Sequence, residues 1–332
     1  MNNSSTNNFE SIRIDTIKNH ILSSWGIIYL VFGSIGTLLN LCVFTRRAHW
    51  HFSPCIPYLF ASTLATIPLM YVSILSRIGI GLQITPFYYI PILCKLQVYI
   101  SNVSVSLVIW FTIGSCWDRY LSSSRNALTR RMSSLRNTRR TVLIITFCIS
   151  FAYAQIFYCF EGNLIMAAAP CSPKNTQCSI IDTTLLFVIQ FSAPPLIIFY
   201  FGINIYLNVR QMKYQRQMPT ISITKATQTR NNQKTDRIIL RMVFIQVTLL
   251  LICSLPVFAF RLYTTLTLTT AKNSLRRSVE NLIFNVTLLI YYFEKVCSFY
   301  IYTITSRHFR QILWQFIITI RSDNIIVPEN QK

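Results

Sequence analysis

The chain has 332 residues, of which 52% are hydrophobic and only 12% are charged. A water-soluble protein of this size needs more polar surface than this composition provides, so a membrane is the expected solvent. The excess of 31 Lys and Arg over 10 Asp and Glu would suit a nucleic-acid-binding protein. That function needs basic residues gathered on a soluble face, whereas here they lie between long apolar runs, and we expect no nucleic-acid partner.

Seven apolar stretches are long enough to cross a bilayer as helices, which takes about 20 residues for a hydrocarbon core of roughly 30 Å. We therefore predict an all-α fold in which a seven-transmembrane helix bundle fills residues 21–305 and follows an N-terminal tail over 1–20. With flanking turns, the predicted spans cover about 21–45, 55–78, 94–119, 141–160, 183–209, 238–261 and 281–305.

The distribution of basic residues predicts the orientation of the bundle. Cytoplasmic segments of membrane proteins carry an excess of Lys and Arg. With the N-terminus outside, the inner segments hold 21 of the 31 basic residues and the outer segments hold nine. We expect a multi-pass protein of the plasma membrane, with an extracellular N-terminus and a basic inner face against the lipid bilayer.

Several spans contain short motifs, which follow in chain order. The first span holds Asn40, and the third begins at Cys94 and ends in Asp118-Arg119-Tyr120, with Arg119 lying 25 residues after Cys94. The sixth span contains Cys253-Ser254-Leu255-Pro256, and the seventh ends in Ser298-Phe299-Tyr300-Ile301-Tyr302. Together these motifs resemble those of the rhodopsin-like (class A) G-protein-coupled receptors, and they extend over nearly the whole chain.

The resemblance implies a switch at the inner end of the third span. In the family, the Arg of the triplet rests against its neighbouring acid and against an acid at the inner end of the sixth span. Here Asp118, Arg119 and Tyr120 would form the triplet and Asp236, 20 residues before the sixth-span proline, would be the second acid. Tyr302 would complete the switch, and the partner on this side would be a heterotrimeric G protein.

Other family positions depart from the usual pattern. The resemblance places Asn40, Thr66 and Ser298 in a polar network in the bundle core, and Cys253 and Pro256 at a kink of the sixth span. Thr66 replaces the second-span acid of the family, and Ser298 replaces its seventh-span Asn. A sodium site needs hard oxygen ligands and a carboxylate, so we predict no such site. The scattered cysteines predict no other metal site, and no cofactor is expected.

The second outer loop is expected to be joined to the third span by a disulfide. Cys94 can pair with Cys178 or with Cys171. We favour Cys178 because it lies closer to the start of the fifth span, although connectivity does not follow from sequence alone.

The candidate ligand pocket comprises Ser101, Arg261, Glu294 and Lys295. Charges inside a membrane cost about 3 kcal/mol or more unless paired or hydrated, so one of the last two should face a wet pocket. Adjacent helical side chains point about 100° apart, and we therefore expect that these two do not simply neutralise each other. Amine receptors of the family carry an Asp at the position of Ser101, which disfavours a biogenic amine. A peptide is the expected ligand. In motifs such as Ser53-Pro54-Cys55, which leads the second span, the chain also loosely resembles invertebrate neuropeptide receptors such as those for FMRFamide-like peptides.

Two other functions stay open at this point. The charges of Glu294 and Lys295 could relay ions in a seven-helix transporter, or Lys295 could hold retinal as a Schiff base in a photoreceptor. No phosphate-binding loop, metal-ligand cluster or nucleophile and base pair is recognisable, so we do not expect an enzyme. The remaining residues, 306–332, are predicted to form a short amphipathic eighth helix on the membrane surface and a cytoplasmic tail.

Overall fold

The computed structural model describes residues 2–45, 54–84, 90–124, 126–162, 171–215, 245–246, 248–267, 270, 272–305 and 310; at 2–8, 209–215 and 302 the description covers the backbone only. In chain order its helices are α1 (Asn2–Phe44), α3 (Ile56–Pro68), η1 (Leu69–Ile74), α4 (Leu75–Gly81), α6 (Pro91–Ser123), α7 (Ala127–Met132), α8 (Leu135–Tyr153), α9 (Ile156–Cys159), α10 (Thr176–Leu186), η2 (Phe187–Ser192), α11 (Ala193–Gln215) and α13 (Ser274–Thr305), and η1 and η2 are π-helical. The sixth span is the helix Thr248–Leu266.

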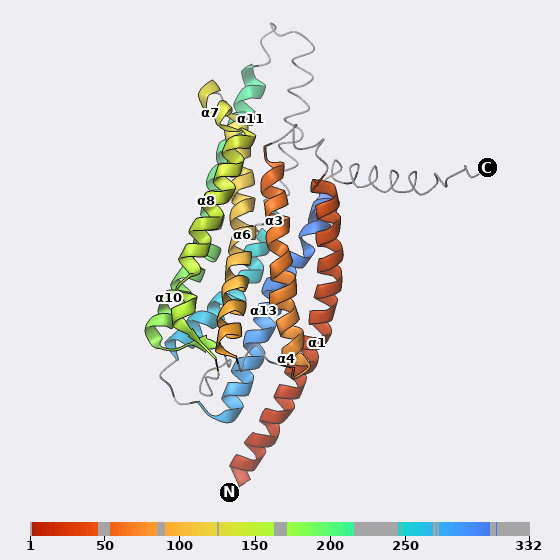
Figure 1. Cartoon of the computed structure of the whole chain (residues 1–332), viewed down its shortest axis with the longest axis vertical. Helices are drawn as coiled ribbons and strands as arrows, with labels where there is room; N and C mark the ends of the chain where they lie inside the picture. Colours follow the sequence, from red (N-terminus) through yellow and green to blue (C-terminus); the bar gives the residue numbers. More distant parts are fainter. Residues whose placement is uncertain are drawn as a thin grey trace, which may run out of the picture.

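Seven of the described helical segments are long and apolar enough to cross a membrane, which confirms the predicted fold class. They run side by side along the long axis of the molecule (Figure 1). A bundle of this kind satisfies its backbone hydrogen bonds within each helix, as a hydrocarbon environment requires. The protein is therefore a multi-pass membrane protein.

The outer face of α8 shows directly that the surface of the bundle is apolar. Leu143, Phe147 and Phe151 follow one another at four-residue spacing and are 70%, 72% and 74% exposed. Residues with this spacing lie on one side of a helix. A stripe of large apolar side chains is unfavourable in water and favourable against lipid, so this side of α8 faces the hydrocarbon.

The centre of the bundle is α6, which packs against α3, α8 and α11. Close approach to α3 depends on Gly114, since a Cβ atom there would lie 2.6 Å from ring carbons of Tyr58. Near the other end of the bundle, a Cβ on Gly81 would lie 2.6 Å from the backbone nitrogen of Ser23 in α1. These two glycines allow neighbouring helices to touch at opposite ends of the molecule.

The first helix is longer than the sequence predicted. We expected a tail over residues 1–20, but α1 begins at Asn2 and extends past the bundle beside the N-terminus (Figure 1). Polar residues of this extension have partners: the Asp15 carboxylate pairs with Lys18 at 2.9 Å and accepts a hydrogen bond from Ser278 of α13 at 3.1 Å. Only the charge-free part of α1 forms a continuous apolar run, so the sequence did not predict this anchored extension.

A small antiparallel hairpin lies at the same end of the bundle as the N-terminus (Figure 1). Its strands are β1 (Phe160–Glu161) and β2 (Ser172–Pro173), with Phe160 opposite Pro173. The predicted eighth helix and tail over 306–332 lie, apart from residue 310, outside the described residues.

Candidate functional site

A small pocket of about 60 Å³, lined by both polar and apolar side chains, lies inside the bundle near the hairpin. Two of the four residues predicted for a ligand pocket, Ser101 and Arg261, contribute to its wall. The wall is formed by Arg77, Gln97, Val98, Ser101, Asn102, Val105, Leu186, Gln190, Val257, Arg261, Phe284, Leu288, Tyr291 and Tyr292. These side chains come from α4, α6, α10, η2, the sixth span and α13, so the pocket exists only in the assembled bundle.

One side of the pocket is fixed by a buried hydrogen-bond network. The Gln190 amide donates to Ser106 Oγ at 3.0 Å and to the Tyr153 hydroxyl at 2.9 Å, and its carbonyl oxygen accepts from the Tyr291 hydroxyl at 2.7 Å. The four residues belong to η2, α6, α8 and α13. Gln190 lies in a π-helical turn, a local widening that often occurs at functional sites. A network with every member paired holds these helices in one arrangement.

Two arginines lie near a common aromatic ring in the pocket wall. The Arg261 guanidinium pairs with the Asp182 carboxylate of α10 at 3.3 Å, and the Arg77 guanidinium donates to Asn285 Oδ1 at 3.1 Å. Both guanidiniums lie beside the Phe284 ring, at 5.9 Å from its centroid for Arg77 and 5.2 Å for Arg261. The pocket therefore carries concentrated positive charge on one side.

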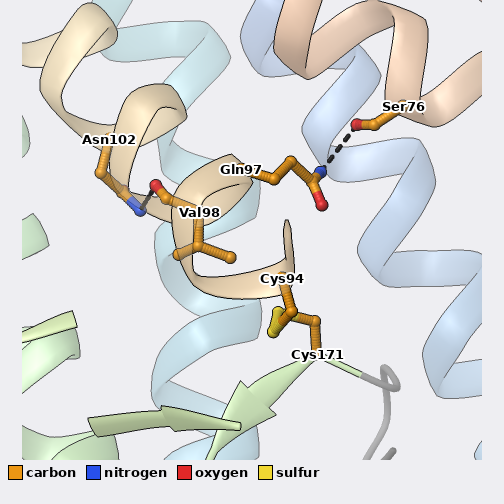
Figure 2. Close-up of a disulfide and its surroundings, with 6 residues drawn as sticks. All are labelled: Ser76, Cys94, Gln97, Val98, Asn102 and Cys171. Atoms are coloured by element: carbon orange, nitrogen blue, oxygen red, sulfur yellow. Dashed lines mark hydrogen bonds between the residues drawn. A yellow bond between two sulfur atoms is a disulfide. The ribbon is translucent and has the colours of Figure 1, made fainter. Parts of the chain in front are cut away.

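The α6 side of the pocket offers smaller polar groups. Ser101 Oγ accepts a hydrogen bond from Ser73 at 2.6 Å, and the Gln97 amide donates to Ser76 at 2.7 Å. Gln97 Oε1 is buried and has no hydrogen-bond partner among the described residues. Figure 2 shows Gln97 reaching toward Ser76 one turn after Cys94, which is joined to Cys171.

The disulfides correct our preference for Cys178. Cys94 pairs with Cys171, and Cys178 pairs with Cys159 (Figure 2 shows the first bond). Cys171 immediately precedes β2, and the hairpin brings it across the first turn of α6. Cys178 lies in the first turn of α10, where Asn175 accepts a hydrogen bond from its backbone N–H at 2.9 Å, and this turn faces the end of α9. Cys178 is closer in sequence to the fifth span, as we noted, but its position in the first turn of α10 sets it beside Cys159 and not beside Cys94.

Glu294 and Lys295 lie in the bundle core and form an ion pair with each other. Their exposed fractions are 0% and 3%. We expected that adjacent residues could not neutralise each other, and this was wrong, because the two long side chains bend toward one another despite leaving the helix in different directions. Neither residue belongs to the pocket wall as the described residues define it. Lys295 therefore offers no free amine to that pocket.

Of the other predicted core positions, Asn40 and Thr66 are buried and Ser298 is partly buried, and no hydrogen bond found in the described part of the chain joins them. Thr66 Oγ1 donates to the backbone oxygen of Ser62 at 2.9 Å, and Ser298 Oγ donates to that of Lys295 at 3.0 Å. Such bonds stay within one helix. Asn40 is buried, and its Oδ1 atom has no hydrogen-bond partner in the described part of the chain.

The sixth-span motif lies against α13. The buried Cys253 thiol lies close to the backbone of Glu294. Pro256 lies inside the helix Thr248–Leu266, one residue before Val257 of the pocket wall. No group of three or more His, Cys, Asp or Glu side chains in the described ranges is placed to hold a metal ion.

The Asp118-Arg119-Tyr120 triplet lies at the opposite end of α6 from the pocket. The Asp118 carboxylate is buried and accepts a hydrogen bond from Ser133 Oγ at 2.6 Å. The Tyr120 ring stacks on Phe201 of α11, with centroids 5.5 Å apart. Asp236 and the side chain of Tyr302 lie outside the described residues, so the predicted contact between Arg119 and Asp236 stays a prediction.

Sequence reasoning missed four residues that shape the pocket: Arg77, Asp182, Gln190 and Tyr291. The first two had a usable signal, because each directly adjoins a charge-free run and so marks the end of a span. The other two had none, since a polar residue in an apolar helix does not reveal which neighbour it faces.

Comparison with known proteins agrees with this architecture. Residues 36–302 match the family described as 7 transmembrane receptor (rhodopsin family), and this range contains both the pocket and the triplet. No curated protein sequence matches the chain. Because the matched range covers most of the 332 residues, the chain belongs to the rhodopsin family of seven-transmembrane receptors.

Proposed function

We propose that this protein is a plasma-membrane receptor that binds an extracellular peptide and activates a heterotrimeric G protein inside the cell. The pocket near the hairpin would receive the peptide. The end of α6 that carries the Asp118-Arg119-Tyr120 triplet would face the G protein.

The observation that carries this proposal is that one helix links the two sites. Ser101 and Asn102 of α6 contribute to the pocket wall, and Asp118 lies near the other end of the same continuous helix. At 1.5 Å per residue, the helix covers about 25 Å between them. A ligand that shifts or rotates α6 at the pocket therefore acts on the surroundings of the triplet without any further connecting element.

The proposed orientation rests on charge and on cysteine chemistry. The segments on the triplet side hold 21 of the 31 Lys and Arg residues, as expected of a cytoplasmic face. The two disulfides lie at the opposite end, and disulfides persist in the oxidising exterior. Both features support an extracellular N-terminus.

The wall of the pocket supports a peptide as the ligand. It combines amide and hydroxyl groups, at Gln97, Ser101 and Asn102, with the aromatic rings of Phe284 and Tyr292. A peptide presents backbone hydrogen-bonding groups together with apolar side chains, and so it can use both kinds of surface.

A second-messenger assay of the expressed chain against a peptide library tests the proposal. We expect at least one peptide to give a saturable response that is abolished by Arg119→Ala at matched surface expression. An Arg276→Gln variant is the matched control, because Arg276 lies outside both the pocket and the triplet. A chain that reaches the cell surface and carries a substrate flux, with no G-protein response to any peptide, would contradict the proposal.

A further inference from the structure

We infer that Arg77 and Arg261 form an anion subsite in the pocket, which holds a carboxylate of the ligand. The inference rests on the proposed function only for the identity of the ligand as a peptide. The carboxylate could be the C-terminus of the peptide or an acidic side chain, because both present the same two oxygens.

The charges around the pocket are not balanced. Arg261 has the Asp182 carboxylate at 3.3 Å. The described partners of Arg77 are the neutral Asn285 amide and the Phe284 ring, and no described carboxylate lies within ion-pair distance of it. Two guanidiniums and one carboxylate leave an excess of one positive charge, which favours a ligand that supplies a negative one.

The two arginines also have hydrogen-bonding capacity left over. The Nε atoms of Arg77 and Arg261 are buried, and neither has a hydrogen-bond partner among the described residues. Leaving a buried donor unpaired is unfavourable, and pairing it with a charged acceptor is favourable. A carboxylate matches the planar donor geometry of a guanidinium and accepts two hydrogen bonds from it side by side. Both arginine side chains line the same pocket and lie beside the Phe284 ring, so the positive charge of both acts on an anion that enters the pocket.

A second cluster, near the start of α13, also has two cations for one carboxylate, but there both cations contact that carboxylate. There the Glu280 carboxylate pairs with Lys272 at 2.7 Å and with Arg276 at 3.0 Å, and it accepts a hydrogen bond from Tyr263 at 2.9 Å. That carboxylate has a partner for each oxygen, and the cations share it. Among the described residues, no carboxylate contacts Arg77, which distinguishes the pocket from this cluster.

Thermal unfolding of the purified full chain with small probes tests the subsite. N-acetylphenylalanine carries a terminal carboxylate, and N-acetylphenylalaninamide has the same shape without the charge. A ligand that binds only the folded protein raises its unfolding temperature by an amount that grows with the ratio of ligand concentration to Kd. We expect the acid to bind about ten- to hundredfold more tightly than the amide, the range for hydrogen bonds to charged groups. N-acetylaspartic acid α-amide, with its carboxylate on the side chain, and inorganic phosphate complete the series.

Arg77→Gln is the decisive variant, because its partners are neutral and its replacement leaves no buried carboxylate unpaired. We expect this variant to remove most of the difference between acid and amide, and the Arg276→Gln control to retain it. Preferential binding of N-acetylphenylalanine would indicate a C-terminal carboxylate, and preferential binding of the aspartic acid amide an acidic side chain.

Equal binding of acid and amide to the unaltered chain would overturn the inference, and this comparison needs no variant to fold. Stabilisation by phosphate with none by either carboxylate would overturn it too, as would an acid preference that survives Arg77→Gln. The response to a peptide agonist separates the subsite from the receptor function. If this response is unchanged by C-terminal amidation, by neutral replacement of the acidic residues of the peptide and by Arg77→Gln, the subsite is contradicted and the proposed receptor function stays intact. Binding of the acid, with no second-messenger response to any peptide, would contradict the proposed receptor function and leave the subsite intact.

Discussion

At the scale of single residues, the adjacent charges of Glu294 and Lys295 show how a membrane bundle accommodates ionised groups. Both side chains are buried, and each is the other's ion-pair partner. Pairing lowers the unfavourable free energy of placing charge in a medium of low dielectric constant, which an isolated charge would bear in full. The pair is therefore expected to matter for stability and not for ligand binding, since neither residue belongs to the pocket wall.

Replacing one member of this pair should be more harmful than replacing both. Glu294→Gln leaves the Lys295 ammonium buried without its partner, and we expect it to destabilise the protein by about 3 to 5 kcal/mol. The double variant Glu294→Gln and Lys295→Met removes both charges and should recover most of that loss. Chemical denaturation of the purified protein measures the difference, and equal stability of the single and double variants would contradict the pairing.

A second prediction concerns the acids around Arg119. The proposed contact of Arg119 with Asp236 would hold the inactive state by about 1 to 3 kcal/mol, which shifts a two-state equilibrium by about ten- to hundredfold. We expect Asp236→Ala to raise basal second-messenger signalling, while Asp323→Ala, which removes an acid from the tail, should not. Unchanged basal activity of Asp236→Ala at matched surface expression would exclude this contact as the switch.

At the scale of elements, the hairpin of β1 and β2 is held at both ends by covalent bonds. Cys94–Cys171 ties it to α6, and Cys159–Cys178 ties the end of α9 to the start of α10. The first bond closes a chain segment of 77 residues and the second one of 19. The loss of conformational entropy in the unfolded chain grows with the closed length, so the first bond is expected to stabilise the fold more.

Peptide mapping without reduction should recover these two cross-links. A peptide that joins Cys94 to Cys178 would contradict the structure directly. Replacing Cys94 and Cys171 by Ser should reduce both stability and the ligand response, because Cys94 lies one turn before Gln97 of the pocket wall. Replacing Cys159 and Cys178 should reduce mainly stability, by about 3 kcal/mol for a loop of this size.

At the scale of the whole molecule, an odd number of membrane crossings separates the two chain ends. Seven described helical segments meet the length and composition of a span. The pocket and the triplet lie toward opposite ends of α6, which is what a receptor needs in order to carry a signal across the membrane.

Epitope tags at the two termini test this topology. We expect an N-terminal tag to be stained by antibody on intact cells, and a C-terminal tag to be stained only after permeabilisation. The basic triplet side gives the physical reason, because Lys and Arg residues are retained on the cytoplasmic side during insertion. Staining of both tags in the same condition would contradict seven spans, whatever the motifs indicate.

The sequence by itself determined the fold class, because apolar length and helical backbone bonding act along the chain and require no knowledge of neighbours. It also placed the triplet toward a helix end, and two of the four residues that it proposed for a ligand pocket, Ser101 and Arg261, line the pocket of the structure. Its least accurate results were the start of α1 and the cysteine connectivity, since both depend on which surfaces meet.

Only the tertiary structure decided how side chains from different helices combine. Arg77 and Arg261 are far apart in the chain and lie against the same ring only because α4, the sixth span and α13 have particular rotations about their axes. A rotation of about 100° per residue means that neighbours in sequence face different partners, so polar residues in apolar helices do not reveal their contacts until the helices are packed. In the same packing, Glu294 and Lys295 form an ion pair with each other, and the pocket retains an excess of one positive charge.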